Sequence, residues 1–264
     1  MKKILALLLT SVIAVVLAAC SSGDSSSSKE NEMTKIEKSG TITVGTEGTY
    51  RPFTFHDEDT NKLTGFDVDV VTEIAKRLDL KVKFEETQWD SMFAGLNASR
   101  FDVIANQVGI NSEREKKYDL SEPYSTSTAV IVTAKDNDKI KTMADLKGVK
   151  VAQSLTSNYG KIAQEAGADI QSVDGLSQSL TLIKQGRIDA TVNDKLAVLD
   201  YMKETGDTSV KIAAELDKET SSSAFAFRKD TGIKAKFDKE LTAMKKDGTL
   251  KKISEKWFGQ DVSK

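Results

Sequence analysis

The chain contains little of the chemistry on which most enzymes rely. Its 264 residues include one cysteine, Cys20, and one histidine, His56. A lone cysteine has no partner for a disulfide, and no Ser/His pair or cluster of metal ligands appears in the sequence. We therefore expect a protein that is not an enzyme, with no catalytic residues, no metal and no cofactor, although a carboxylate acting as acid or base stays open.

The sequence also lacks an excess of either charge. Its 38 Lys and Arg residues nearly balance its 40 Asp and Glu residues, which leaves a formal net charge of −2. Proteins that bind nucleic acids usually carry a basic surface, so we expect no nucleic-acid partner. The length suits one large domain or two of ordinary size.

The apolar stretch near the N-terminus, Ile4–Leu17, is too short to span a membrane comfortably. It follows a basic start, which is the layout of a secretory signal peptide. Residues 17–20 read Leu-Ala-Ala-Cys, which resembles a lipobox and implies cleavage before Cys20 and its modification by lipid such as palmitate. The alternative is an ordinary signal peptide in which Cys20 stands by chance.

Strands and helices alternate after the N-terminal segment. Strands are expected at Thr41–Gly45, Lys81–Glu86 and Phe101–Asn106, with helices between them at Gly65–Leu78 and Asp90–Ser99. This order predicts a mostly parallel sheet that is covered on both faces.

A second unit repeats the plan, with strands and helices expected at Val149–Ala152, Tyr159–Ala166, Asp169–Val173, Leu176–Gln185 and Ile188–Val192. An internal echo links the units, because residues 100–106 match residues 187–193 in residue class and each heptad follows a predicted helix. Two like units that each end a strand at a polar site would give this pattern.

Two extended apolar runs, Ala129–Ala134 and Ser223–Arg228, lie at the borders of the second unit. The C-terminal stretch Lys234–Phe258 is helical and amphipathic, with a break at Asp247-Gly248. If this tail packs on the first unit, the chain crosses between the units twice and the two runs are hinge strands.

A basic residue stands where a helix start favours an anion. After the predicted strand at 101–106, the chain restarts as a helix at Ser112, with Glu115 at the spacing of a capping box. Arg114 then lies in the first turn, where the helix dipole is positive. Two interpretations stay open: a surface pair with Glu113 or Glu115, or a carboxylate site made by the guanidinium and free backbone N–H groups.

Several motifs resemble the solute-binding proteins that serve ABC importers of polar amino acids. The signature is GFDVDVVTEIA at residues 65–75, and further matching blocks lie at 45–50, 111–115 and 186–189 and in the closing Asp-Gly-Thr-Leu and Lys-Trp-Phe-Gly. Within this family, residues 86–96 and 105–109 look closest to the L-cystine-binding lipoproteins.

The resemblance implies a two-lobed periplasmic-binding-protein-like fold of type II, in which two α/β lobes are joined by two hinge strands. The expected division is a signal peptide at 1–19, a lipidated Cys20 with a Ser-rich tether at 20–36, lobe 1 at 37–129 and 225–264, and lobe 2 at 130–224. We expect a monomer that is anchored by lipid to the extracytoplasmic face of the cell membrane.

The resemblance also implies how a ligand is bound in the cleft. Arg114 matches the arginine that grips the ligand α-carboxylate, helped by backbone donors near Gly109 and by Thr156 and Ser157 at a helix start. Asp194 matches the acid that takes the α-ammonium. Thr156, Ser157 and Asp194 also have a simpler interpretation, as caps of the helices that follow them.

Five more positions match the family's ligand contacts. Tyr50 and Trp89 match aromatic residues that sandwich the ligand's carbon chain, and Glu47, Asn106 and Gln107 stand where the ligand side chain is read. Many relatives have hydroxyl residues at positions 106, 107 and 109, where this chain has Asn, Gln and Gly. Alternatively, Trp89 is a core residue, Tyr50 anchors a loop and Glu47 is a solvated acid.

Together these features predict a substrate-binding lipoprotein of an ABC amino-acid importer. It would bind a polar amino acid, L-cystine before histidine, arginine or glutamine, and deliver it to the permease and its ATPase. A dehydratase related to the amino-acid-binding proteins and a sensor with the same fold are the alternatives.

The lipobox gives a direct prediction. Cys20→Ala removes the acceptor of the lipid, so the protein should move from the membrane fraction to the medium or remain as uncleaved precursor. Cell fractionation measures this, and mature Cys20→Ala protein that stays in the membrane would show that lipid is not attached at Cys20.

Overall fold

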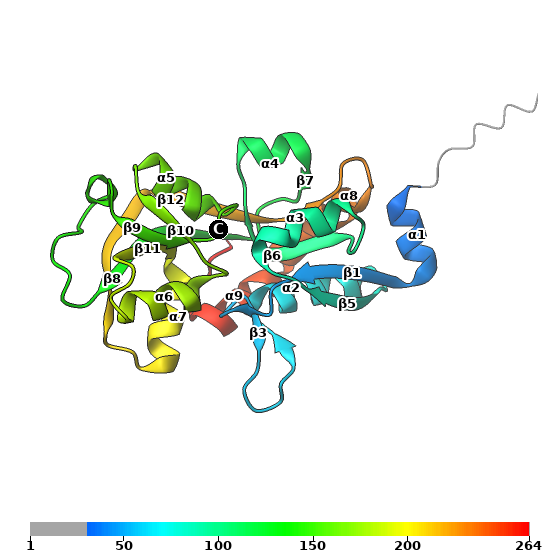
Figure 1. The fold of residues 1–264 in the computed structure, drawn as a ribbon. Coiled ribbons are helices and arrows are strands. Elements are labelled where there is room, and N and C mark those ends of the chain that lie inside the picture. The colour runs from blue at the N-terminus through cyan, green and yellow to red at the C-terminus, as the bar shows by residue number, and fades with distance from the viewer. Residues whose placement is uncertain (1–30, 264) are drawn as a thin grey trace, which may run out of the picture. The chain divides into compact units, whose positions relative to one another are not determined.

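The protein is described here by a computed structural model that covers residues 31–263. Within this range a nine-stranded sheet has the order β10-β9-β11-β8-β12-β6-β1-β5, with β7 beside β12 (Figure 1). The strands are β1 (Thr41–Thr46), β5 (Lys81–Glu86), β6 (Val103–Gly109), β7 (Asp119–Leu120), β8 (Ser125–Ala134), β9 (Lys150–Gln153), β10 (Asp169–Ser172), β11 (Ala190–Asp194) and β12 (Val210–Phe227). A small separate sheet contains β2 (Thr49–Tyr50), β3 (Thr54–His56) and β4 (Leu63–Thr64).

Two parallel groups of strands form the ends of the large sheet. In the first α/β unit β1 pairs with β5 and β6, and in the second β9 pairs with β10 and β11, all in parallel. The first unit carries α1 (Glu32–Ser39), α2 (Phe66–Arg77), α3 (Trp89–Asn97), α4 (Ser112–Lys117), α8 (Ile233–Asp247) and α9 (Thr249–Phe258). The second carries a 3-10 turn (Met143–Leu146), α5 (Asn158–Glu165), α6 (Leu176–Lys184) and α7 (Lys195–Thr205).

The long strands β8 and β12 connect the two units. They pair antiparallel with each other, while β8 also pairs with β11 and β12 with β6. Helices α8 and α9 pack on α2, so the C-terminal tail returns to the first unit as expected. The predicted architecture of two α/β lobes joined by two strands is confirmed. Both strands extend beyond the predicted runs, because the polar stretch before Ser223 also pairs with β8.

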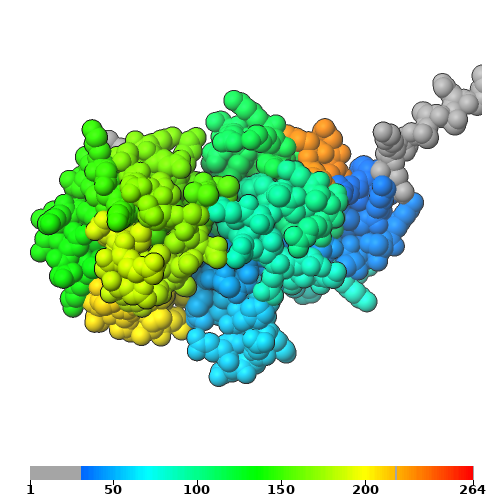
Figure 2. All heavy atoms as spheres, viewed as in Figure 1, coloured from blue at the N-terminus to red at the C-terminus, as the bar shows by residue number. Residues whose placement is uncertain are grey.

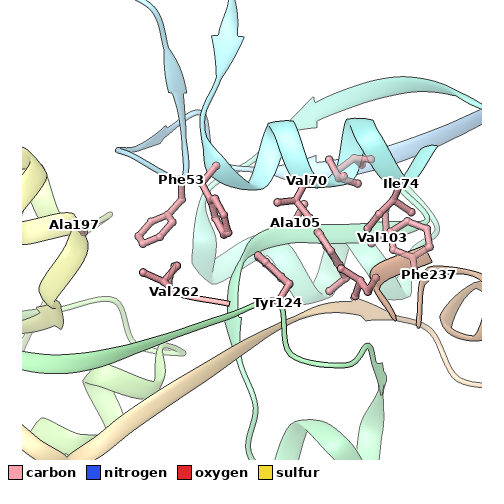
Figure 3. Packing of buried hydrophobic residues seen from close by; sticks show 14 of the residues in the cluster. Phe53, Val70, Ile74, Val103, Ala105, Tyr124, Ala197, Phe237 and Val262 are labelled. Atoms are coloured by element: carbon pink, nitrogen blue, oxygen red, sulfur yellow. The ribbon is translucent and has the colours of Figure 1, made fainter. Parts of the chain in front are cut away.

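The core of the first unit lies between α2 and the sheet. Val70 and Ile74 of α2 face Val103 and Ala105 of β6 in Figure 3, and these side chains are fully or almost fully buried. The helical spacing predicts an apolar face that includes Val71 and Ile74, and both are buried, together with Val70. The ring of Tyr124 stacks on Phe225 at a centroid distance of 4.3 Å and continues this core toward the connecting strands.

A close approach fixes α3 against the sheet. The buried ring of Phe101 lies between Gly45 of β1 and Gly95 of α3, and a Cβ at Gly45 would come within 2.5 Å of that ring. Both positions therefore need glycine for lack of space. Since α3 begins at Trp89, this packing also decides where Trp89 stands.

Residues 32–36, which the sequence assigned to the tether, form the first part of α1 in the structure. Asn31 caps this helix by accepting the Thr34 N–H at 2.9 Å. Met33 and Ile36 are only 2% and 5% exposed, so they belong to the core. The predicted signal peptide at 1–19 and the modified Cys20 lie outside the described residues. No helix within residues 31–263 combines the length and the apolar character needed to cross a membrane.

The tight packing around Phe101 predicts that a methyl group added at Gly45 destabilises the protein. Gly45→Ala should lower the free energy of unfolding by about 1 to 3 kcal/mol, because a filled core has to distort. Gly175→Ala is the control, since its added Cβ meets no heavy atom within 4 Å. Urea unfolding of both variants tests this, and equally small effects would contradict the packing argument.

Candidate functional site

A cavity of about 560 Å³ lies where the two units meet. In Figure 2 the green-to-yellow atoms of the second unit border the cyan-to-green atoms of the first. Of the predicted site residues, six line the cavity: Glu47, Tyr50, Trp89, Asn106, Gln107 and Ser157. Four do not line it, namely Gly109, Arg114, Thr156 and Asp194, and their contacts give the reason.

Arg114 is placed by the short helix α4. The N-cap of this helix is Asn111, whose side chain accepts the Arg114 N–H at 2.9 Å. The predicted capping box at Ser112 is therefore wrong by one residue. Asn is among the strongest N-cap residues and Asn111 has the extended backbone that a cap requires, whereas Ser112 already lies within the helix.

The guanidinium of Arg114 is a buried cation. The residue is 7% exposed, and its Nη1 and Nη2 donate to the carbonyl oxygens of Gly109 at 2.7 Å and Thr156 at 3.0 Å. Burial lowers the pKa of Arg114 to about 10, so the side chain stays charged at neutral pH. Among residues 31–263 no ion pair includes Arg114, and Glu113 pairs with Lys117 instead. The interpretation as a surface pair is therefore wrong.

A buried charge without a counter-ion is costly, and the cost falls when an anion comes within hydrogen-bond distance. Both carbonyl partners of Arg114 are neutral. A guanidinium has five N–H donors in a fixed fork, so donors remain after these two bonds. The geometry therefore favours a small anion, such as a carboxylate, beside Arg114, which lies against the cavity-lining residue Trp89.

Thr156 bonds across to the first unit. Its N–H and Oγ1 donate to Oδ1 of Asp90 at 3.0 and 2.7 Å, and the Leu155 N–H donates to Oδ2 at 3.2 Å. With its carbonyl on Arg114, all polar groups of Thr156 have partners. Ser157 is the N-cap of α5, where its hydroxyl accepts the Gly160 N–H at 2.9 Å. Its capping role is confirmed, and it lines the cavity as well.

Asp194 is the N-cap of α7, as the simpler interpretation predicted. Its side chain accepts the Leu196 N–H at 2.7 Å, the Ser127 hydroxyl at 2.9 Å and the Tyr159 hydroxyl at 2.9 Å. The residue is 2% exposed, and burial raises the pKa of its carboxyl. It follows Asn193 in the chain and is bonded to Tyr159, and both of these residues line the cavity.

The aromatic pair borders the cavity as the resemblance implied. The Tyr50 hydroxyl donates to Oδ1 of Asn193 at 2.9 Å and so links the two units. Trp89 is the first residue of α3, and its ring lies 5.2 Å from the Arg114 guanidinium carbon. Tyr50 also contacts Phe53 at a centroid distance of 5.2 Å. Both residues line the cavity.

Glu47 is an acid without a basic neighbour. Its Oε2 accepts from Nδ2 of Asn106 at 2.6 Å. Burial raises the pKa of Glu47 to about 7, and the negative charges of Asp90 and Asp174 add to this effect. The described residues that line the cavity include no Lys, Arg or His. A ligand ammonium group would therefore find acids there without competition from a protein cation.

Asn106 and Gln107 are held by bonds within the first unit. Oδ1 of Asn106 accepts the Glu47 N–H at 2.9 Å. Nε2 of Gln107 donates to Asp67 at 2.6 Å, and its Oε1 accepts the Ser125 hydroxyl at 3.0 Å. The Gln107 amide is thus bonded to the protein on both sides, although the residue contributes to the cavity wall.

Several wall residues were not predicted from the sequence: Gln88, Gln153, Tyr159, Asp174, Ser177, Gln178 and Asn193. The internal echo contains a signal for one of them. Asn106 and Asn193 occupy the same place in the two matched heptads, and both reach the cavity. Within residues 31–263 no group of three or more His, Cys, Asp or Glu side chains is placed to hold a metal ion.

The fold and the site define a class of protein. The chain belongs to the bacterial extracellular solute-binding proteins, family 3, whose model matches residues 42–260. It is a substrate-binding protein for an amino acid and works with an ABC transporter.

Two curated relatives are similar to this chain over nearly its whole length. The chain is 58% identical over 270 residues to the L-cystine-binding protein TcyA of Bacillus subtilis, covering 100% of both chains. It is 40% identical to the L-cystine-binding protein TcyJ of Escherichia coli K12, covering 97% of this chain and 96% of the relative.

Solved structures are similar over most of the chain. The L-cystine solute receptor of Neisseria gonorrhoeae, in an unliganded open conformation, is 54% identical, covers 88% of this chain and 98% of its own, and has a TM-score of 0.58. An ancestral arginine-binding protein bound to arginine is 40% identical, with coverage of 83% and 98% and a TM-score of 0.77. The arrangement found here is thus closer to the ligand-bound structure, although that protein is less similar in sequence.

The buried guanidinium predicts the effect of two substitutions. Arg114→Lys should weaken L-cystine binding, because an ammonium cannot replace a fork of parallel donors. Arg114→Ala should weaken it by about 2 to 5 kcal/mol, since a desolvated carboxylate loses its partner. Isothermal titration calorimetry measures both. Lys117→Ala, which removes an exposed cation from the same helix, is the control, and equal affinities in Arg114→Ala and Lys117→Ala would contradict this role.

Proposed function

We propose that this chain is the L-cystine-binding component of an ABC importer. The observation that carries the proposal is the charge pattern of the site. A buried guanidinium without an anion, Arg114, lies against Trp89 in the wall of a cavity whose described lining includes acids and no cation. This pattern is complementary to an amino-acid zwitterion.

In the proposed complex the α-carboxylate of the ligand lies beside Arg114 and the α-ammonium beside Asp194. The ligand carbon chain runs between Tyr50 and Trp89. Gly109 and Thr156 act through Arg114, because their carbonyl oxygens hold the guanidinium. Ser157 lines the cavity and brings the backbone N–H groups at the start of α5 to the ligand.

L-Cystine has a second zwitterionic end, which the other candidate amino acids lack. Glu47 and Asp174 line the cavity and offer negative charge to a second ammonium. Asn106, Gln88 and Ser177 add neutral hydrogen-bonding groups for the second carboxylate. The volume of about 560 Å³ lies within the range of small-molecule sites. These features, with the names of the relatives, support L-cystine over histidine, arginine or glutamine.

We propose lobe boundaries at 37–129 with 225–264 and at 130–224, with residues 32–36 added to the first lobe. The Asp90–Thr156 and Tyr50–Asn193 bonds then join the lobes over the ligand. We further propose a monomer that catalyses no reaction, anchored through lipid on Cys20 and closing on its ligand to present a surface to the permease.

L-Cystine should bind with a dissociation constant in the micromolar range or below, which corresponds to about −8 kcal/mol or better. Calorimetric titration of the ligand-free protein tests this, with arginine, histidine and glutamine as comparison ligands. Saturation by one of these without any heat from cystine would reject the proposed ligand while keeping the family. Chemical conversion of a bound amino acid would instead favour the dehydratase alternative.

A further inference from the structure

Gln107 has an unusual backbone for a residue within a strand. Its φ is +49°, in the left-handed region that residues with a Cβ adopt only at a cost in energy. The other non-glycine residues with positive φ in the described range, Asn61, Asp79, Ser99 and Asp230, lie outside helices and strands. A conformation of this kind persists when surrounding contacts enforce it.

The left-handed residue sits in a bulge of β6. Across the pairing with β12, Val108 faces Ala224 and Ile104 faces Ala226, so three residues of β6 stand against one of β12. Successive side chains of a regular strand point to opposite faces. The bulge breaks this alternation, and the neighbours Asn106 and Gln107 both reach the cavity.

Asp67 is the residue that holds this conformation. It lies in the first turn of α2 and is 0% exposed. Its Oδ2 accepts the Gln107 N–H at 2.7 Å, and its Oδ1 accepts from Nε2 of Gln107 at 2.6 Å. One carboxylate therefore binds the backbone and the side chain of the same residue. Burial raises the pKa of Asp67 to about 7, so this buried acid is kept at a cost.

The contacts of Gln107 continue in two directions. Its Oε1 accepts the hydroxyl of Ser125, the first residue of connecting strand β8. Two residues further along β6, the carbonyl of Gly109 accepts from Nη1 of Arg114. The position of Gln107 thus affects both the wall of the cavity and the residue that holds the guanidinium.

We infer that Asp67 is a positioning residue of the ligand site, which acts by fixing the left-handed conformation of Gln107 and thereby the end of β6 that supports Arg114. The inference rests on the proposed function, because it assumes that the ligand occupies this cavity. It also changes the expected role of Gln107. Its amide bonds to Asp67 and Ser125 and therefore does not contact the ligand side chain.

The test compares affinities in a double-mutant cycle, with L-cystine as the probe at pH 8, where Asp67 is ionised. Asp67→Leu has a similar shape but accepts no hydrogen bond, and it should raise the dissociation constant at least 10-fold. Gln107→Gly adopts a positive φ without strain. In that background, Asp67→Leu should change the dissociation constant less than 3-fold.

Asp69→Leu is the matched control, since Asp69 lies in the same turn of α2 and bonds to Lys256 and Trp257 of α9. It should lower thermal stability and leave the dissociation constant within 2-fold. Should Asp67→Leu not fold, Asp67→Ser takes its place with the same expected direction, because one oxygen on a shorter side chain replaces the two carboxylate oxygens that each accept one Gln107 donor.

An unchanged dissociation constant in the Asp67 variant would overturn the inference, as would the same fold change in both Gln107 backgrounds. If the wild-type protein does not bind L-cystine, the proposal of L-cystine as the ligand is wrong. The same cycle with L-arginine then tests the role of Asp67.

Discussion

The site depends on one buried positive charge. The guanidinium of Arg114 is held by two neutral carbonyl oxygens, and no described acid pairs with it. One of those carbonyls belongs to Gly109 of the first unit and the other to Thr156 of the second. The same side chain therefore carries a charge without a counter-ion and joins the two units. A carboxylate beside this side chain would supply the missing charge.

Besides this charge, several hydrogen bonds join the two units. Asp90 binds the Leu155–Thr156 backbone, Tyr50 binds Asn193, and Nε2 of Gln88 donates to Asp174 at 3.2 Å. On the outer surface Arg51 pairs with Asp200 at 3.4 Å and Glu204 at 3.2 Å. Exposed bonds of this kind contribute little stability each. The contacts between the units are thus individually weak.

The sequence predicted those features that depend on local pattern. The period of Val71 and Ile74 located α2, residues 81–86 were predicted as the strand that is β5, and the break at Asp247-Gly248 separated α8 from α9. The capping roles of Ser157 and Asp194 follow from their place before a helix. The family resemblance indicated which of these residues lie near one cavity, and six of the ten do line it.

Features that depend on distant partners could not be predicted. Asp90 and Thr156 are 66 residues apart, and nothing in either neighbourhood signals their bond. The first turn of α1 is short and polar, and Met33 shows its role only once the core is assembled. The backbone conformation of Gln107 could not be predicted from the sequence for a similar reason. Its cause is a carboxylate 40 residues earlier, within a motif that also reads as an ordinary acidic helix start.

The most direct test of this account is a crystal structure of the protein with L-cystine. It should show one carboxylate of the ligand within about 3 Å of a guanidinium nitrogen of Arg114, the distance of a charge-assisted hydrogen bond. The ligand carbon chain should lie between Tyr50 and Trp89. A ligand whose carboxylates both bind elsewhere, with Arg114 bonded only to Gly109 and Thr156, would contradict the account.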